Sequence, residues 1–289
     1  MNYARALVRS LWLRNAVRPG EPVVLPSLER TAPAGVQSER RLARFRELAG
    51  YPDDGRLPLT WPQAAAFPLH FAMMVDDRFP LPLVGTVHVR TELRQARPIG
   101  AGEPLRLVAS LSKSRTTDKG LEFDLETRAY VGPELVWEGT ATMLRRAPVQ
   151  TGLPERLSRP PLDGIGAGNH PWQVPVRVGR DFARLTGDLN PIHLSGLAAR
   201  PLGFKGLVAH GLWTMSRAAG MRPALLALPR LVMTCELKTP LVLPARAVYR
   251  DWPAADEQGV EYRVLDARAE KPHALGVLRS EMAGLPDSR

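Results

Sequence analysis

A carboxylate and an imidazole stand close together in the sequence DLNPIH, as Asp188 and His193. Pro191 lies between them. Proline fixes its own φ and disfavours a helical conformation at the preceding residue, so we expect a bent segment here rather than a regular helix. Such a bend can turn both side chains toward one point. Because histidine titrates near neutrality and a carboxylate can act as a base or orient one, the pair could hold a water molecule and move its proton.

The same residues also allow a purely structural interpretation. Asp and Asn side chains bond their own backbone in turns, so Asp188 and Asn190 could serve only to cap a turn. For an Asp and a His taken alone, this interpretation is the more common one. The pattern that surrounds them favours the catalytic interpretation.

This longer pattern resembles the signature of the MaoC-like, or hydratase 2, family. The matching parts occur in the family's order and spacing, and they are Phe182-Ala183, Thr186-Gly187-Asp188, Asn190-Pro191-Ile192-His193, Gly203-Phe204 and His210-Gly211. Two departures lie outside the Asp–His pair: Phe182 stands where Tyr is usual, and Ser195-Gly196 replaces a usual Asp and its neighbour. They bear on substrate fit rather than on the chemistry.

The resemblance implies an enzyme of fatty-acid metabolism that hydrates trans-2-enoyl thioesters or dehydrates (R)-3-hydroxyacyl thioesters. In that scheme Asp188 and His193 hold the water, and the backbone N–H of Gly211 binds the enolate oxygen at a helix start, where free amides favour negative charge. Close packing against a sheet is the alternative role for Gly211. Asn190 and His210 complete the candidate substrate-binding set. The simpler interpretation is that Asn190 holds the loop in place and that His210 has a structural role.

Two other functions stay open. A non-catalytic subunit could keep the fold and bind acyl thioesters, and hotdog thioesterases share the fold with a different reaction. The intact pair of Asp188 and His193 favours the hydratase, because neither alternative has a reason to keep it.

Composition limits the class of protein. With 289 residues, 44% of them hydrophobic, the chain has room for two domains. The single cysteine, Cys235, excludes an internal disulfide framework and a Cys-based metal cluster, so we expect a cytoplasmic protein. No apolar run is long enough to cross a membrane.

The net charge of +10 comes almost wholly from arginine. Arginine binds phosphate well, so the charge fits a substrate carried by CoA or by an acyl-carrier protein, although simple compositional bias is the more common explanation. Few aromatic residues accompany the basic ones, so we expect no nucleic acid partner. The resemblance implies neither a metal nor a redox cofactor, and it leaves a homodimer open.

Alternating apolar and polar residues predict strands in two sets that bracket the motif. The expected strands are 57–60, 84–93, 105–114, 121–131 and 135–146, and then 173–178, 231–243, 245–252, 259–269 and 273–283. Helices are expected at 38–49, 61–74 and 209–221. The order of a strand, a helix and a run of strands therefore occurs twice, which is an α+β arrangement in duplicate. Together with the family resemblance, this order implies a double hotdog, in which each half is a bent antiparallel sheet around a central helix.

We therefore expect four parts. Residues 1–56 form an N-terminal arm and lead-in, 57–147 a degenerate hotdog half, 148–172 a Pro- and Gly-rich linker, and 173–289 the MaoC-like half. The basic first twenty residues suggest a peripheral helix, with a cleaved transit peptide as the alternative. Since only the second half has an insertion, at about 182–207, between its first strand and its helix, we expect one active site per chain.

Overall fold

The computed structural model describes residues 23–146 and 167–281. In these residues, ten strands form one antiparallel sheet whose order is β1-β3-β4-β5-β2-β7-β10-β9-β8-β6. The strands are β1 (Leu28–Gly35), β2 (Thr86–Gln95), β3 (Leu105–Thr117), β4 (Gly120–Val131), β5 (Glu134–Arg146), β6 (Ala167–Val174), β7 (Leu231–Leu237), β8 (Ala245–Pro253), β9 (Gly259–Asp266) and β10 (Pro272–Ser280).

The sheet consists of two five-stranded halves that join edge to edge at β2 and β7. Six residue pairs make this seam, from Arg90 opposite Glu236 to Gln95 opposite Leu231. The joint removes one free edge from each half, which leaves only β1 and β6 at the outer edges. The two halves therefore share one continuous sheet.

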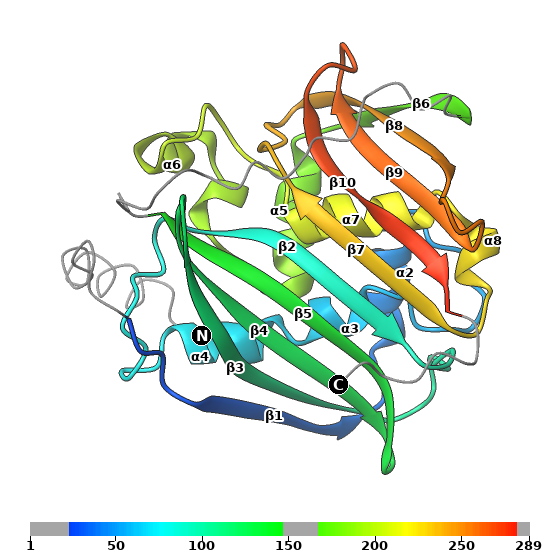
Figure 1. Ribbon diagram of the computed structural model, residues 1–289, viewed down its shortest axis with the longest axis horizontal. Coiled ribbons are helices and arrows are strands. Elements are labelled where there is room, and N and C mark those ends of the chain that lie inside the picture. The colour runs from blue at the N-terminus through cyan, green and yellow to red at the C-terminus, as the bar shows by residue number, and fades with distance from the viewer. Residues whose placement is uncertain (1–22, 147–166, 282–289) are drawn as a thin grey trace.

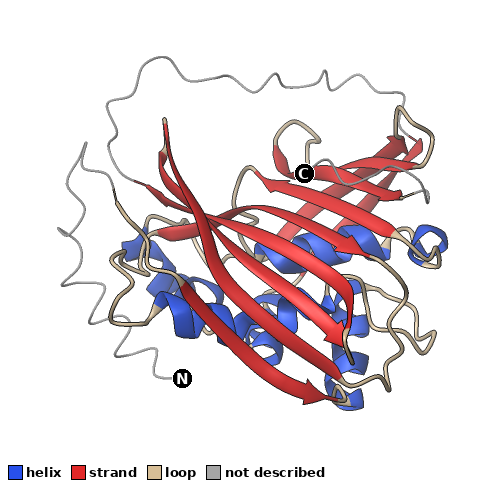
Figure 2. Ribbon diagram, turned by 60° about the horizontal axis from the view of Figure 1, so that its bottom comes forward, coloured by secondary structure: helices blue, strands red, loops and turns tan. Residues whose placement is uncertain are grey.

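The helices lie on one side of this sheet, which curves around them (Figures 1 and 2). They are α2 (Glu39–Ala49), α3 (Trp61–Ala65), α4 (Phe67–Met74), α5 (Arg177–Thr186), α6 (Gly196–Ala199), α7 (Gly211–Gly220) and α8 (Pro223–Leu226), with the short 3-10 helices η2 (Pro191–His193) and η3 (Arg200–Leu202). None of these helices has the length and apolar character needed to cross a membrane.

The order of elements repeats. In the first half β1 and α2 precede the helical stretch α3–α4, and in the second half β6 and α5 precede α7; four strands follow each time. The halves differ in what lies after α2 and α5. Residues 50–60 connect α2 to α3, whereas the longer segment 187–210 connects α5 to α7 and carries the sequence motif.

Contacts between the halves fix α7, the helix that follows the motif. The indole N–H of Trp213 donates to the Leu48 carbonyl oxygen at 2.8 Å. The hydroxyls of Ser216 and Thr60 lie 2.8 Å apart, and both side chains are buried. Each buried polar group thus has a partner on the other half, which anchors α7 in one position.

Most of the expected elements are present. The helix at 38–49 is α2 and that at 209–221 is α7. The strands after 84 and after 231 occur within a few residues of the expected bounds, except that the strand expected at 231–243 ends at Leu237 as β7. The helix expected at 61–74 is interrupted at Ala66, between α3 and α4, where Pro68 follows in the first turn of α4.

The predicted positions of the first strand in each set, 57–60 and 173–178, were wrong. Residues 57–60 form no strand; Leu57 and Leu59 are buried in the core, and the first strand is β1, which pairs with β3. The second set begins with β6 from residue 167, inside the expected linker, and ends before α5 takes up residues 177 and 178. β1 and β6 are edge strands, where Pro and Gly are tolerated, so their sequences resemble connecting segments.

These strands change the expected boundaries. We propose that the N-terminal half begins at β1 rather than at residue 57, and the C-terminal half at β6 rather than at 173. The basic N-terminal segment and most of the expected linker lie outside the described residues.

Candidate active site

The end of helix α5 places Asp188 at the site. Gly187 has a φ of 84°, and its N–H donates to the Ala183 carbonyl oxygen at 2.8 Å, which closes the helix in the left-handed conformation that glycine adopts without strain. The Thr186 hydroxyl accepts the backbone N–H of Asp188 at 3.2 Å and donates to the Phe182 carbonyl oxygen at 2.9 Å. The Thr-Gly-Asp sequence therefore reverses the chain and turns Asp188 out of the helix axis.

A second reversal holds His193. The Asn190 side chain accepts the N–H of Ile192 at 3.4 Å, at the start of the 3-10 turn η2. Two bonds then join this turn to the strand-like segment ahead of α7: the Val208 N–H donates to the Ile192 carbonyl oxygen at 2.9 Å, and His193 Nδ1 lies 2.8 Å from the Val208 carbonyl oxygen. Asn190 is thus a loop-pinning residue in this structure, and its contact with substrate stays a prediction.

The contact with Val208 determines where His193 carries its proton. A carbonyl oxygen only accepts, so Nδ1 of the neutral ring must be the N–H, and Nε2 keeps a free lone pair. That Nε2 lies 3.9 Å from Oδ2 of Asp188. The separation is too long for a direct hydrogen bond, but it allows one water molecule to donate to both atoms.

His210 packs directly against this pair. Its ring stacks on that of His193 with centroids 3.6 Å apart, and its Nε2 lies 3.2 Å from the backbone oxygen of Asp188. Phe182 covers another side of the His210 ring, at 5.1 Å. The buried Nδ1 of His210 has no hydrogen-bond partner among the described residues. The structure therefore brings Asp188, His193 and His210 together.

Burial controls the charges of the three groups. It raises the pKa of Asp188 above its ordinary value, against the effects of His193 and the Asn190 N–H. It lowers the pKa of His193, against the effects of Asp188 and the Val208 carbonyl, and it holds the pKa of His210 well below the ordinary value. At neutral pH His193 is therefore a neutral base. The Asp188 side chain is 22% exposed, so its carboxylate is partly accessible to solvent.

One ligand atom from each of Asp188, His193 and His210 lies within 4.8 Å of the others, close enough to consider a metal ion. The positions of the hydrogens on the two imidazole rings are incompatible with a site in which all three residues bind a metal. His210 Nε2, the ring atom 3.7 Å from the Asp188 carboxylate, must carry its hydrogen to donate to the Asp188 backbone oxygen, so it cannot bind a metal beside His193 Nε2 and the carboxylate. Zinc sites use at least three protein ligands, so the arrangement fits a bound water better than a metal.

Gly211 starts helix α7, one residue after His210. A Cβ at this position would lie 2.2 Å from Cδ1 of Leu237 on β7, so the absence of a side chain lets the helix start approach the sheet closely. The packing role of Gly211 thus has a structural basis. Its proposed N–H bond to an enolate oxygen is compatible with the position and stays a prediction.

An open hollow of about 420 Å³ adjoins the catalytic segment. Asn190, Pro191 and Ile192 form one wall, with Leu202 and Phe204 from the same insertion. The opposite wall comes from the first half, as residues 83–87 at the start of β2. Both halves therefore line this hollow, whereas Asp188 and His193 themselves do not.

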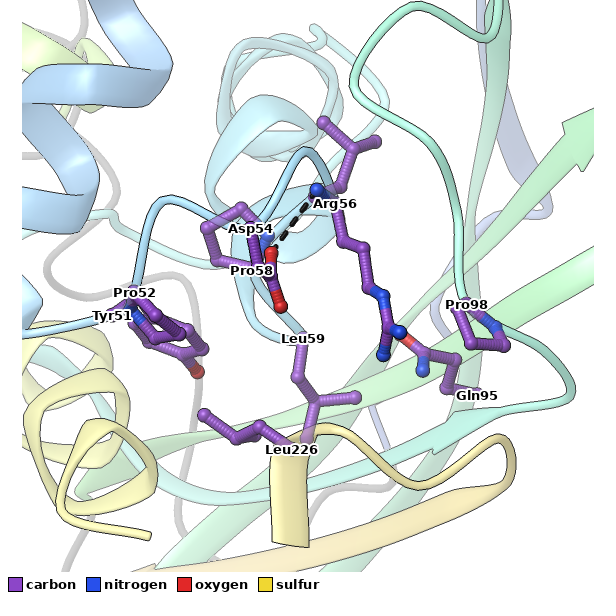
Figure 3. A pocket seen from close by; sticks show the side chains of 10 residues that line it. Tyr51, Pro52, Asp54, Arg56, Pro58, Leu59, Gln95, Pro98 and Leu226 are labelled. Carbon is purple, nitrogen blue, oxygen red and sulfur yellow. Dashed lines mark hydrogen bonds between the residues drawn. The ribbon is translucent and has the colours of Figure 1, made fainter. Parts of the chain in front are cut away.

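A second hollow of about 350 Å³ lies elsewhere, between residues 51–59, the end of β2 and α8 (Figure 3). Leu57, Leu59 and Leu226 give it apolar walls, and Arg56 lies over one side, its N–H bonded to Asp54 at 3.1 Å. None of the three site residues lines it.

The sequence assigns no role to four other histidines, His70, His88, His170 and His273, because none has a titratable partner at a readable spacing. The structure brings two of them, His70 and His88, near each other. His70 on α4 and His88 on β2 are close enough for His88 to lower the pKa of His70, and burial depresses both pKa values to about 4. His70 bonds to Thr127 at 2.7 Å and His88 to Thr91 at 2.5 Å. The spacing of His70 and His88 along the chain does not indicate this proximity. The sequence also does not show that the Val208 carbonyl oxygen accepts the hydrogen of His193 Nδ1.

Comparison with known proteins agrees with this geometry. Residues 175–237, which include every site residue named above, match the family model described as "MaoC like domain". The 3-hydroxyacyl-thioester dehydratase X of Mycobacterium tuberculosis is 29% identical over 178 residues, which are 60% of this chain and 62% of that protein. The match thus spans less than two thirds of the relative.

Solved structures resemble nearly the whole chain. The crystal structure of HtdX from M. tuberculosis superposes with a TM-score of 0.73 at 24% identity, over 88% of this chain and all of that one. A MaoC-like dehydratase from Phytophthora capsici gives a TM-score of 0.73 at 16% identity, over 92% of this chain and 99% of its own. The described residues therefore share the double-hotdog fold of these solved structures, and residues 175–237 resemble a MaoC-like domain.

Proposed function

We propose that the chain catalyses the reversible addition of water to trans-2-enoyl thioesters, and the reverse dehydration of (R)-3-hydroxyacyl thioesters, in fatty-acid metabolism. One observation carries the proposal. His193 Nε2 and Asp188 Oδ2 both have free lone pairs and lie 3.9 Å apart, and the residues between them in the sequence, Asn190 to Ile192, line an open hollow. The dehydratase name of the Mycobacterium relative supports the same reaction.

In the hydration direction the pair holds a water molecule by both of its hydrogens. The water oxygen then attacks C3 of the enoyl group, one proton passes to the pair, and the C2–C3 π electrons move toward the thioester carbonyl. The proton finally goes to C2, so that water is added across the double bond and no oxidation occurs. A neutral His193 suits this step because it can take and return the proton near neutral pH.

The intermediate charge rests on the thioester oxygen and needs a donor. The N–H of Gly211, in the first turn of α7, has no acceptor among the described backbone groups and fits this role. Removing such a donor typically costs about 10²–10³ in rate. The close approach of Gly211 to Leu237 fixes the position of this N–H relative to the sheet.

The hollow beside Asn190–Ile192 supplies a route for the thioester. Its walls are largely apolar and uncharged, which suits a neutral pantetheine arm and the first carbons of an acyl chain. Because residues 83–87 form one wall, the first half contributes to substrate binding without supplying a member of the catalytic pair.

A thioesterase is the strongest alternative, since the same water could attack the carbonyl carbon instead of C3. The assay must therefore separate addition from hydrolysis. Crotonyl-CoA and a longer trans-2-enoyl-CoA would be followed by loss of the enoyl-thioester absorbance, and released thiol would be measured in parallel. We expect absorbance loss with no free thiol. Stoichiometric thiol release would indicate a thioesterase, and binding of both thioesters without either reaction would indicate a scaffold subunit.

A further inference from the structure

The insertion that carries the catalytic loop also presents an unusual surface. Its short helix α6 projects from the body of the molecule (Figure 1). Leu197 on this helix is 76% exposed, and Leu189, beside Asp188, is 39% exposed. Only three other large hydrophobic residues are this exposed in the described parts of the chain, and neither of these two leucines contributes to the core.

Three basic residues belong to the segments next to Leu197. Arg200 continues the helical conformation three residues later, so it lies on the same side of the turn. The N–H of Phe204 donates to the Ala199 carbonyl oxygen at 3.2 Å, which folds the exposed Lys205 back beside α6. On the other side, Arg180 Nε donates to the Leu194 carbonyl oxygen at 3.0 Å, just before α6 begins.

These three cations have no acidic partners. No described carboxylate lies within ion-pair distance of Arg180, Arg200 or Lys205. The two acidic residues of the insertion and its flanking helix are already engaged: Asp181 bonds to Arg44 and Arg184, and Asp188 belongs to the site. The surface therefore combines an exposed leucine with a rim of uncompensated positive charge, the composition of a protein-binding patch for an acidic partner.

The patch adjoins the route to the site. Leu202 and Phe204, which line the hollow beside the catalytic segment, belong to the same insertion as Leu197, Arg200 and Lys205. A partner bound here would stand next to the opening through which a thioester must pass. A free nucleotide carrier would use the positive charges but would leave Leu197 uncovered.

We propose that the surface around Leu197, Arg180, Arg200 and Lys205 is the docking site of an acyl-carrier protein, a small acidic protein that delivers the acyl thioester on a phosphopantetheine arm. The inference rests on the proposed function and specifies the substrate class as a protein-bound thioester. Opposite charges across the rim accelerate encounter, and the leucine supplies the apolar contact at the centre.

The test compares two substrates with the same acyl group, crotonyl-CoA and the crotonyl thioester of a type II acyl-carrier protein. The variant is Arg200→Glu with Lys205→Glu, and Leu197→Ser is tested separately. The matched control is Arg230→Glu, an equally exposed arginine before β7 at the far end of α7, without an acidic partner among the described residues. Circular dichroism checks the fold, which exposed substitutions should leave intact.

We expect the apparent KM for the carrier-protein substrate to rise about tenfold or more in the double variant, while its kcat/KM for crotonyl-CoA stays within about twofold of the wild-type value. The control variant Arg230→Glu should stay within about twofold of the wild type with both substrates. An equal rise for both substrates would assign the cations to the CoA phosphates and overturn the proposal. An unchanged carrier-protein KM would overturn it as well.

Failure of the proposed function gives a different result. If the wild-type protein hydrates neither thioester, binding of fluorescently labelled carrier protein replaces the assay. Loss of binding in the double variant would then support the docking surface, and equal binding by wild type and variant would contradict it.

Discussion

Acid should destabilise the first half of the molecule through two histidines, the buried His70 and the partly buried His88. Burial lowers both pKa values from 6.5 to about 4. The unfolded chain therefore binds more protons than the folded chain below pH 6.5, so the stability is complete above that pH and is lost as the pH falls toward 4. His70 is buried and bonds to Thr127, and the partly buried His88 bonds to Thr91, so these contacts hold both neutral rings in place.

The loss can be estimated from the shifts. Each pKa unit corresponds to about 1.4 kcal/mol, so two units of acidification, from pH 6.5 to 4.5, remove about 2–3 kcal/mol for each histidine. Together they remove about 5 kcal/mol as an upper figure, since protonation of one ring opposes protonation of the other. This is a large share of the roughly 5–15 kcal/mol that stabilises a typical protein.

Urea unfolding followed by tryptophan fluorescence and circular dichroism at pH 7.5, 6.5, 5.5 and 4.5 measures the effect. The variant His70→Gln with His88→Gln keeps polar, uncharged side chains, so its unfolding free energy should fall less steeply with acid than that of the wild type. Its turnover at pH 7.5 should remain near the wild-type value, since neither residue belongs to the site. Equal pH dependence in both proteins would refute the reasoning, and loss of turnover by a factor of about 10³ would show that the first half takes part in catalysis.

Three further predictions concern the site itself. First, kcat/KM for an enoyl thioester should fall on the acid side with an apparent pKa below 6.5, because burial lowers the pKa of His193 and only the neutral ring accepts a proton; a limb above 6.5 would contradict this. Second, His210→Ala removes the stacked ring and the bond to the Asp188 backbone, so turnover should fall by about 10² through misplacement of the pair, with little change in KM; an unchanged kcat in a folded variant would make His210 dispensable. Third, Gly211→Ala should lower turnover at least about tenfold through collision with Leu237, and Leu237→Ala should restore most of it; a single variant with normal turnover would remove both roles of Gly211.

The sequence indicated the interior of the fold well and its edges poorly. Strands β2 to β5 alternate apolar and polar residues because one face packs on helices, and this period is visible without a structure. Strand β1 buries only Leu28 fully among its eight residues, and β6 contains Pro171, so neither has a period to detect. Both lie at sheet edges, where pairing with one neighbour is enough to hold them.

The residues of the candidate site could be predicted from the sequence, but their geometry could not. The motif predicts Asp188, His193 and Gly211 because its order and spacing are specific, and the roles of these residues stay a prediction. It could not show that the Val208 carbonyl sets the tautomer of His193, since any residue offers a carbonyl oxygen. It also could not show that the ring of His210 stacks on that of His193, because this depends on how residues 187–210 fold back to the start of α7.

The most direct test of the proposed reaction replaces the two members of the pair. Asp188→Asn is nearly isosteric, and His193→Ala removes the other acceptor of the same water. Hydration of crotonyl-CoA would be followed for wild type, both single variants and the double variant, with circular dichroism as the control for folding. Each single variant should lose at least about 10² in kcat, and the double variant should be hardly worse than either, because the two groups act as a unit. A folded Asp188→Asn protein with near wild-type turnover would contradict the mechanism.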